Sequence, residues 1–86
     1  MTEIIWKQPA LDFLRKLDNV NSKRIVKKVD DEIKHNIKRY IKGLVNLDFF
    51  KIRIGDYRLF VDYDFSKDKL EINTIKPRKD AYKKLK

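Results

Sequence analysis

The chain has 86 residues and no cysteine, and its 22 lysine and arginine residues against 13 aspartate and glutamate residues give a formal net charge of +9. This length predicts a single domain, residues 1–86, and the lack of cysteine excludes a disulfide framework, a thiolate zinc site and a cysteine nucleophile. With no apolar run of roughly 18 residues and no signal peptide, we expect a cytoplasmic protein without a membrane partner, whose charge favours a polyanionic partner unless it reflects only a lysine-rich composition.

The first half of the chain predicts one strand followed by two helices. Glu3 to Lys7 is expected to form the strand. Pro9 suits the first turn of a helix, which continues at helical spacing to about residue 17. After cap residues 21–22, one long helix is expected, because the apolar residues keep a spacing of three to four as far as residue 44. These residues are Ile25, Val26, Val29, Ile33, Ile37, Tyr40, Ile41 and Leu44.

From residue 50 the apolar period changes to two, which is the spacing of β-strands. Gly55-Asp56 is a two-residue hairpin signal between two such strands, and a loop of this length sets their register. The pairs expected from it are Ile54 with Tyr57, Arg53 with Arg58, Ile52 with Leu59, and Lys51 with Phe60.

A third strand follows a polar turn over residues 66–68. Leu70, Ile72 and Thr74 continue the alternation, and Pro77 ends the strand because it cannot donate to a sheet ladder. Residues 78–85 predict a short C-terminal helix. The order β-α-α-β-β-β-α therefore predicts an α+β fold, in which two helices pack on one face of an antiparallel sheet.

The hairpin register gathers basic side chains on the other face of that sheet. When the alternate apolar residues pack against the helices, Lys51, Arg53 and Arg58 point away from them. Arg53 and Arg58 are then directly opposed, with Cβ atoms about 5 Å apart. Like charges at this distance repel by roughly 1 kcal/mol in water and about 3 kcal/mol at an effective dielectric constant near 20. Such a pair suits a phosphate-binding surface; the alternative is two side chains that splay into solvent.

A second basic cluster follows the last strand and includes Arg78 and Tyr82. A tyrosine among cations could stack on a base or donate a hydrogen bond to a phosphate, although an ordinary basic tail is the alternative. The lysines of this cluster are Lys76, Lys79, Lys83, Lys84 and Lys86. His35 is the single histidine and is expected to be solvated, which excludes a histidine-pair ribonuclease mechanism. No metal-ligand spacing or glycine-rich phosphate loop is present, so we expect neither a metal site nor a cofactor.

The segment from Phe50 to Leu59, FKIRIGDYRL, resembles the central hairpin of the RelE/ParE toxin superfamily: an aromatic residue, alternating basic positions, then Gly-Asp-Tyr-Arg. The segment 78–82, RKDAY, resembles the family's C-terminal element, in which three residues separate an arginine from a tyrosine. The expected order of elements matches the family over nearly the whole chain. The resemblance implies a RelE-like fold.

The resemblance also implies the toxin of a type II toxin–antitoxin system. RelE-like toxins are ribosome-dependent endonucleases that cleave messenger RNA in the ribosomal A site and are held inactive by a cognate RelB-like antitoxin. They cleave by attack of a 2′-hydroxyl on the adjacent phosphate, and lysines and arginines do the work that histidines do in other ribonucleases. By position, the implied catalytic residues are Lys51, Arg53, Arg58, Arg78 and Tyr82, and the implied RNA-binding residues are Lys76, Lys79, Lys83 and Lys84.

The roles of several basic residues, and the function of the protein itself, have alternatives. Lys51 could be a base toward the 2′-hydroxyl or only a phosphate clamp. Bacterial members of the family carry lysine at the position of Arg53, and their proposed general-acid arginine aligns with Lys76, so the proton donor is not assigned. The alternative functions are inhibition of DNA gyrase, as in ParE-like toxins, and non-catalytic binding of nucleic-acid phosphates by the basic sheet.

Overall fold

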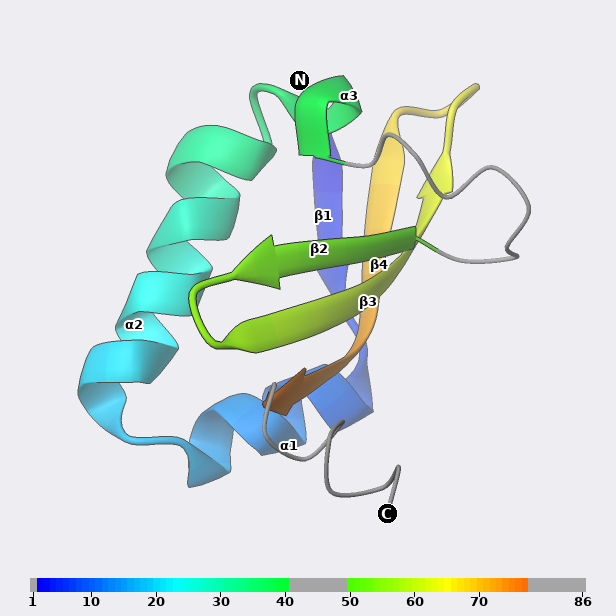
Figure 1. Ribbon diagram of the computed structural model, residues 1–86. Coiled ribbons are helices and arrows are strands. Elements are labelled where there is room, and N and C mark those ends of the chain that lie inside the picture. The colour runs from blue at the N-terminus through cyan, green and yellow to red at the C-terminus, as the bar shows by residue number, and fades with distance from the viewer. Residues whose placement is uncertain (1, 41–49, 78–86) are drawn as a thin grey trace, which may run out of the picture.

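In the part of the chain that the structure describes, four strands form one sheet with helices on one side of it (Figure 1). The computed structural model describes residues 2–40 and 50–77, so the expected C-terminal helix at 78–85 and the last residues of the expected long helix lie outside the described residues. In chain order the elements are β1 (Glu3–Trp6), α1 (Gln8–Lys16), α2 (Asn19–Lys28), the π-helical segment η1 (Val29–Ile33), α3 (Ile37–Tyr40), β2 (Phe50–Ile54), β3 (Tyr57–Asp64) and β4 (Lys69–Pro77).

The sheet has the strand order β1-β4-β3-β2 and is mixed. β2, β3 and β4 form the expected antiparallel meander, but β1 pairs with β4 in parallel. The α+β class is confirmed, and the expectation of a wholly antiparallel sheet is wrong at this one pair. The connection through the helices explains the difference, because it returns the chain to the end of the sheet where β1 began, so that β2 runs in the direction of β1.

α1 and α2 begin at residues that favour a helix start, a proline in α1 and a capping aspartate in α2. α1 has Pro9 in its first turn, as predicted, where the missing N–H of proline has no helical partner to lose. α2 begins at Asn19, slightly before the expected cap at residues 21–22. Asp18 is its N-cap, and the carboxylate of Asp18 accepts hydrogen bonds from Asn21 Nδ2 at 2.9 Å and Asn21 N at 3.0 Å. These hydrogen bonds hold the pKa of Asp18 below its usual value.

The expected single long helix is interrupted between residues 29 and 36. Its buried apolar residues stand four apart in the sequence: Ile25, Val29, Ile33 and Ile37. Each such step turns about 40° more than one full α-helical turn, so a regular helix would rotate the last of these residues away from the core. The wider turn of η1 absorbs this drift, and the chain then bends at residues 34–36 before α3. No helix over residues 2–40 is long and apolar enough to cross a membrane.

A β-bulge at Asn73 changes which residues of β4 face the helices. Phe60 pairs with Thr74 and Val61 pairs with Ile72, so Asn73 is an extra residue between the two pairs. The buried residues of β4 are Leu70, Ile72 and Ile75. The expectation that the alternation continues through Thr74 is therefore wrong, because the extra residue shifts the period and Thr74 points to the other face.

The core lies between the helices and one face of the sheet. Its buried members are Ala10, Ile25, Val29, Ile33, Ile37, Ile52, Ile54, Leu59, Val61, Leu70, Ile72 and Ile75. They are aliphatic residues that alternate along the strands and recur along the helices, as two packed layers require. The residues between them on β2, β3 and β4 point to the opposite side of the sheet, which we call the open face.

Candidate functional site

The hairpin between β2 and β3 has the register that the sequence predicts. Ile54 pairs with Tyr57 across the two-residue loop, and Arg53 pairs with Arg58. Gly55 has a φ of 55°, a left-handed conformation that glycine adopts without a steric penalty. A positive φ at the first loop residue is the pattern of a type II′ turn, whose twist matches that of the strands. The turn therefore fixes which side chains oppose one another on the open face.

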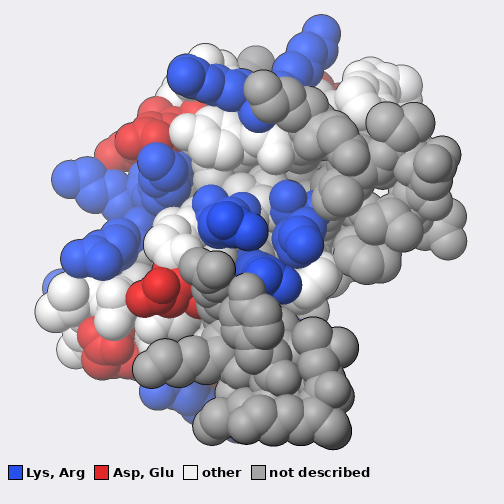
Figure 2. All heavy atoms as spheres, viewed as in Figure 1, with Lys and Arg blue, Asp and Glu red and all other residues white. Residues whose placement is uncertain are grey.

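Three cations stand in one row across the open face. Arg58 on β3 pairs with Arg53 on β2 and with Lys76 on β4, so its side chain has a cation as its direct neighbour on either side. Directly opposed residues on one face have Cβ atoms about 4.5–5.5 Å apart. Lys51 lies two residues before Arg53 on the same face, and both are exposed. We call Lys51, Arg53, Arg58 and Lys76 the cationic patch; Figure 2 shows lysine and arginine side chains grouped over the middle of this face.

Arg58 is the least exposed residue of the cationic patch. Arg58 is half-buried, and its Nε atom is buried without a hydrogen-bond acceptor within the described part of the chain. A buried donor without an acceptor costs about 1–3 kcal/mol, and more when the group is charged. No carboxylate in residues 2–40 and 50–77 forms an ion pair with Arg58. The arrangement suits an external anion, because a phosphate offers a guanidinium fork two acceptor oxygens at once.

The row next to these three cations contains an aromatic residue that the sequence reasoning did not select. Phe60 pairs with Lys51 on one side and with Thr74 on the other, and it is half-buried on the open face. A ring beside cations can stack on a base while the cations hold the phosphates. The signal was present in the sequence, since Phe60 stands at an outward position of an alternating strand.

The charge of the side chains on the open face changes from positive to negative at the bulge. Beyond Asn73 the next pair of β3 and β4 on the open face is Asp62 with Glu71, two acids in place of two cations. Both have partners: Asn73 Nδ2 donates to Asp62 Oδ2 at 2.8 Å, and Lys7 Nζ lies 3.2 Å from Glu71 Oε2. The cationic patch is thus confined to the half of the open face near the hairpin turn.

Only some of the other predicted site residues lie within the described part of the chain. Lys76 lies next to Arg58, as expected from the neighbouring strands. Arg78, Lys79, Tyr82, Lys83 and Lys84 lie outside the described residues, and their roles stay predictions. His35 is exposed, as expected. Residues 2–40 and 50–77 contain no group of three histidine, aspartate or glutamate side chains that could hold a metal ion.

Solved structures provide the comparison with known proteins, since no protein-family model and no curated protein sequence matches the chain. The RelBE2 toxin–antitoxin complex of Mycobacterium tuberculosis matches with a TM-score of 0.79 and 22% identity, covering 90% of this chain and 98% of that chain. The isolated RelE toxin of E. coli matches with a TM-score of 0.71 and 19% identity over 100% of both chains. The archaeal RelE–RelB complex from Pyrococcus horikoshii OT3 matches with a TM-score of 0.70 and 20% identity, covering 90% and 94%.

These similarities extend over nearly the whole length of both chains, at identities near one residue in five. They agree with the resemblance that segments 50–59 and 78–82 and the order of elements carry. The protein has the fold of the RelE toxins.

Proposed function

We propose that the protein is the toxin of a type II toxin–antitoxin system and cleaves messenger RNA in the ribosomal A site. The observation that supports this most is the row Arg53–Arg58–Lys76, in which like charges are opposed and the Arg58 Nε atom is buried without an acceptor within the described residues. The directly opposed pair Arg53–Arg58 is unfavourable in the isolated protein and becomes favourable when a phosphodiester binds.

The proposed reaction needs no metal and no cofactor. The 2′-oxygen of one ribose attacks the adjacent phosphorus atom, a base removes its proton, and the bond from phosphorus to the 5′-oxygen of the next nucleotide breaks. The products are a 2′,3′-cyclic phosphate and a 5′-hydroxyl, which takes its proton from an acid. Negative charge grows on the phosphate oxygens in the transition state, and fixed guanidinium groups stabilise it.

We assign the residues of the cationic patch by their positions. Arg58 and Arg53 are the forks that bind the phosphate oxygens, because they are directly opposed on the open face. Lys51 is exposed and in the next row, where it is the base toward the 2′-hydroxyl or a clamp on a neighbouring phosphate. Lys76, Arg78 and Tyr82 are the candidates for the proton donor, and Lys79, Lys83 and Lys84 are proposed to bind RNA phosphates.

The proposed partners follow from the same proposal. A RelB-like antitoxin, encoded beside this protein, would neutralise it; four of the similar structures are complexes of a RelE toxin with a RelB antitoxin. The ribosome would present the message, which places the action in the cytoplasm. An acidic antitoxin segment fits a basic domain of charge +9.

The experiment that tests the proposal is induced expression followed by primer-extension mapping of a translated message. We expect new 5′ ends within codons of the message in cells with the wild-type protein. The double variant Lys51→Ala/Arg53→Ala should give no new ends and no growth arrest, while remaining folded, because both side chains are exposed. The matched control is Lys23→Ala/Arg24→Ala, which removes the same charges from the exposed side of α2.

Plasmid supercoiling in the same cells separates the main alternative. A protein that arrests growth while messages stay intact and negative supercoiling is lost would be a gyrase inhibitor of the ParE kind. That result, or full toxicity of the Lys51→Ala/Arg53→Ala variant, would refute the proposed function.

A further inference from the structure

A concave surface, which we call the α3 hollow, lies at the opposite end of the sheet from the hairpin turn. It is an open depression of about 830 Å³ between α3, the bend before it, the end of β3 and the β3–β4 turn. Volumes of 300–1,000 Å³ are usual for small-molecule sites. Tyr63 lies five residues beyond Arg58 along β3, so about 17 Å of strand separates the hollow from the cationic patch. The hollow is therefore not part of the site described above.

An aromatic pair forms one wall of the α3 hollow. Phe65 and Tyr63 contact each other edge to face, with ring centroids 4.7 Å apart and an interplanar angle of 79°. Phe65 is 64% exposed, and Val20 is the other large hydrophobic residue that is this exposed in the described part of the chain. An exposed ring that is oriented by a second ring offers a surface for stacking.

Tyr63 is fixed in turn by the β3–β4 turn. Its hydroxyl donates to Asp68 Oδ1, which also accepts a hydrogen bond of 2.6 Å from Thr2 Oγ1. These two bonds lower the pKa of Asp68, the bond from Thr2 first, while the bond to Asp68 raises the pKa of Tyr63. Asp68 therefore stays ionised with two hydroxyl donors, and the aromatic wall has a rigid support.

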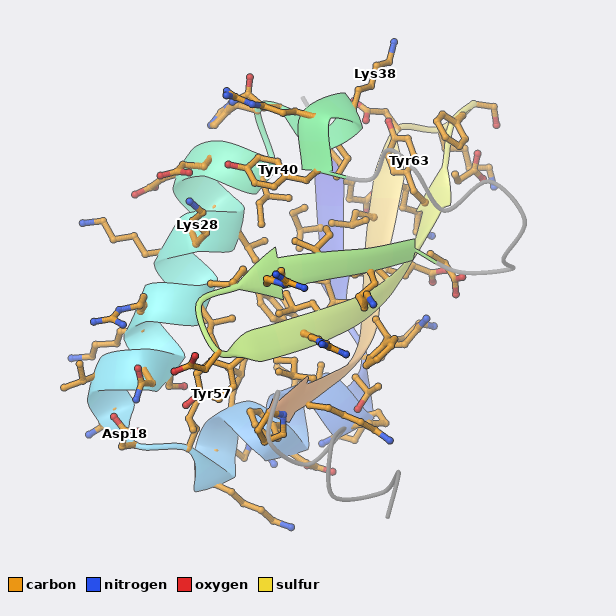
Figure 3. All side chains as sticks on the ribbon, viewed as in Figure 1. Asp18, Lys28, Lys38, Tyr40, Tyr57 and Tyr63 are labelled. Carbon is orange, nitrogen blue, oxygen red and sulfur yellow. The ribbon has the colours of Figure 1, made fainter. Side chains whose placement is uncertain are left out.

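Cations form the opposite wall. Lys34 comes from the bend after η1, and Lys38 and Arg39 come from the first residues of α3. Figure 3 shows Lys38 and Tyr63 at the same end of the molecule, one on α3 and the other on the sheet, with Lys38 extending into solvent. The described residues that line the hollow thus include three permanent cations and one carboxylate, Asp68. An anion entering the hollow is attracted to the α3 side.

We infer that the α3 hollow binds one nucleotide of single-stranded RNA, with its base stacked on Phe65 and its phosphate between Lys38 and Arg39. A nucleotide carries a flat aromatic group and an anion in one unit, which matches the ring on one wall and the cations on the other. An acidic peptide would use the cations but not the exposed ring. The inference rests on the proposed function for the identity of the polymer, and it adds a binding site away from the scissile phosphate.

The test is the affinity of the full chain for a fluorescein-labelled 2′-O-methyl oligouridine of about ten nucleotides, within the usual site sizes of single-strand binders. The methyl groups block attack by the 2′-oxygen, so binding is measured without cleavage. Phe65→Ala should raise Kd about tenfold, because one base can no longer stack, and Phe65→Trp should restore it. Lys38→Ala with Arg39→Ala should weaken binding and reduce the slope of log K against log salt by about 0.7 for each phosphate that the variant no longer neutralises. Val20→Ala, an equally exposed apolar residue on α2, is the matched control.

Each outcome decides the inference. Wild-type affinity in Phe65→Ala, or no rescue by Phe65→Trp, overturns it. So does an unchanged affinity for RNA together with weaker binding of a short poly-glutamate peptide, which would make the hollow a protein-binding surface. The proposed function fails separately: a wild-type protein that cuts no message but still binds RNA through Phe65 would refute cleavage and leave this inference standing.

Discussion

The two ends of the open face differ in how their charges are partnered. At the hairpin end, Arg53 is directly opposite Arg58, whose Nε atom has no acceptor within the described residues. At the other end, near the β3–β4 turn, the acids accept hydrogen bonds from residues close in sequence or on the neighbouring strand. We call this the turn end. Asp64 accepts three hydrogen bonds from Ser66 and Lys67, which hold its pKa below the usual value. The opposed charges at the hairpin end lower the stability of the fold, and the partnered acids at the turn end raise it.

This difference indicates which half of the sheet performs a function. Partnered polar groups contribute to folding and require no ligand, whereas opposed like charges reduce the free energy of unfolding unless an anion binds. Asn73 stands at the boundary, because the bulge separates the pair Phe60–Thr74 from the pair Val61–Ile72. Bulges occur often next to active sites, where they redirect side chains. Here the bulge leaves Lys76 beside Arg58.

The largest effect is expected from Arg58→Ala. The rate of message cleavage should fall by about 10²–10³, since one fixed donor to the transition state is worth about 3–4 kcal/mol. The free energy of unfolding should not fall, because the Nε atom has no acceptor within the described residues. Arg58→Lys should reduce the rate less, because the charge remains and only the fork is removed. Arg24→Ala, on the exposed side of α2, is the control for charge. Full cleavage by Arg58→Ala would show that the hairpin end has no catalytic role.

Deletion of Asn73 should remove the bulge without moving the core. Without the extra residue, Thr74 follows Ile72 directly, so Ile72 and Ile75 stand two positions apart and both still point to the helices. We expect the free energy of unfolding, measured by urea denaturation, to fall by about 0.5–1.5 kcal/mol, because the hydrogen bond from Asn73 to Asp62 is lost. Asn73→Ala removes the same hydrogen bond and keeps the residue count, so it should cost a similar amount. A much larger loss in the deletion variant than in Asn73→Ala would contradict this account of the bulge.

The same bulge marks the limit of what the sequence could predict. The hairpin register was predictable because Gly55-Asp56 is a loop of known length and the flanking alternation is unbroken; the observed pairs confirm it. Beyond it, a uniform period of two places Thr74 inward, which is wrong. The sequence did contain the correction, since Ile75 stands at an odd interval after Ile72. A period-two pattern cannot show a single inserted residue unless the apolar residues on both sides are compared.

The prediction for the helical region was wrong for a related reason. Intervals of four residues satisfy the usual test for a helical face, so the series from Ile25 to Ile37 predicts one continuous helix. The test ignores the rotation that accumulates over several such intervals, which η1 absorbs.

The aromatic wall of the α3 hollow could not be predicted from the sequence, because it depends on the position of α3 against the β3–β4 turn. Contacts between distant segments cannot be read from local periods.

The turn end should show its structural role in the pH dependence of stability. Asp68 has a lowered pKa, so its contribution is present above the ordinary value of 3.8 and is lost as pH falls through the lower folded value. Tyr63 has a raised pKa, so its contribution is present below 10.0 and is lost as pH rises through the higher folded value. The difference in Tm between the wild type and Tyr63→Phe should therefore shrink at both extremes. Tyr57→Phe, which keeps the ring contact with Phe13, is the control; a difference that does not depend on pH would contradict the role of this pair.

The smallest expected effect tests the central claim about the hairpin end, that its charge arrangement opposes stability. Arg53→Glu replaces a repulsive pair with an attractive one across from Arg58, and it should raise the free energy of unfolding by about 0.2–1 kcal/mol. Arg53→Gln removes the repulsion without adding an attraction and should give a smaller gain. Message cleavage should fall in both variants, and more in Arg53→Glu, because a carboxylate beside Arg58 competes with the phosphate for the guanidinium group. Urea denaturation and a cleavage assay on the same preparations make the comparison. If Arg53→Glu lowers stability, the two side chains already splay apart at no cost, and their opposition is no argument for a phosphate site.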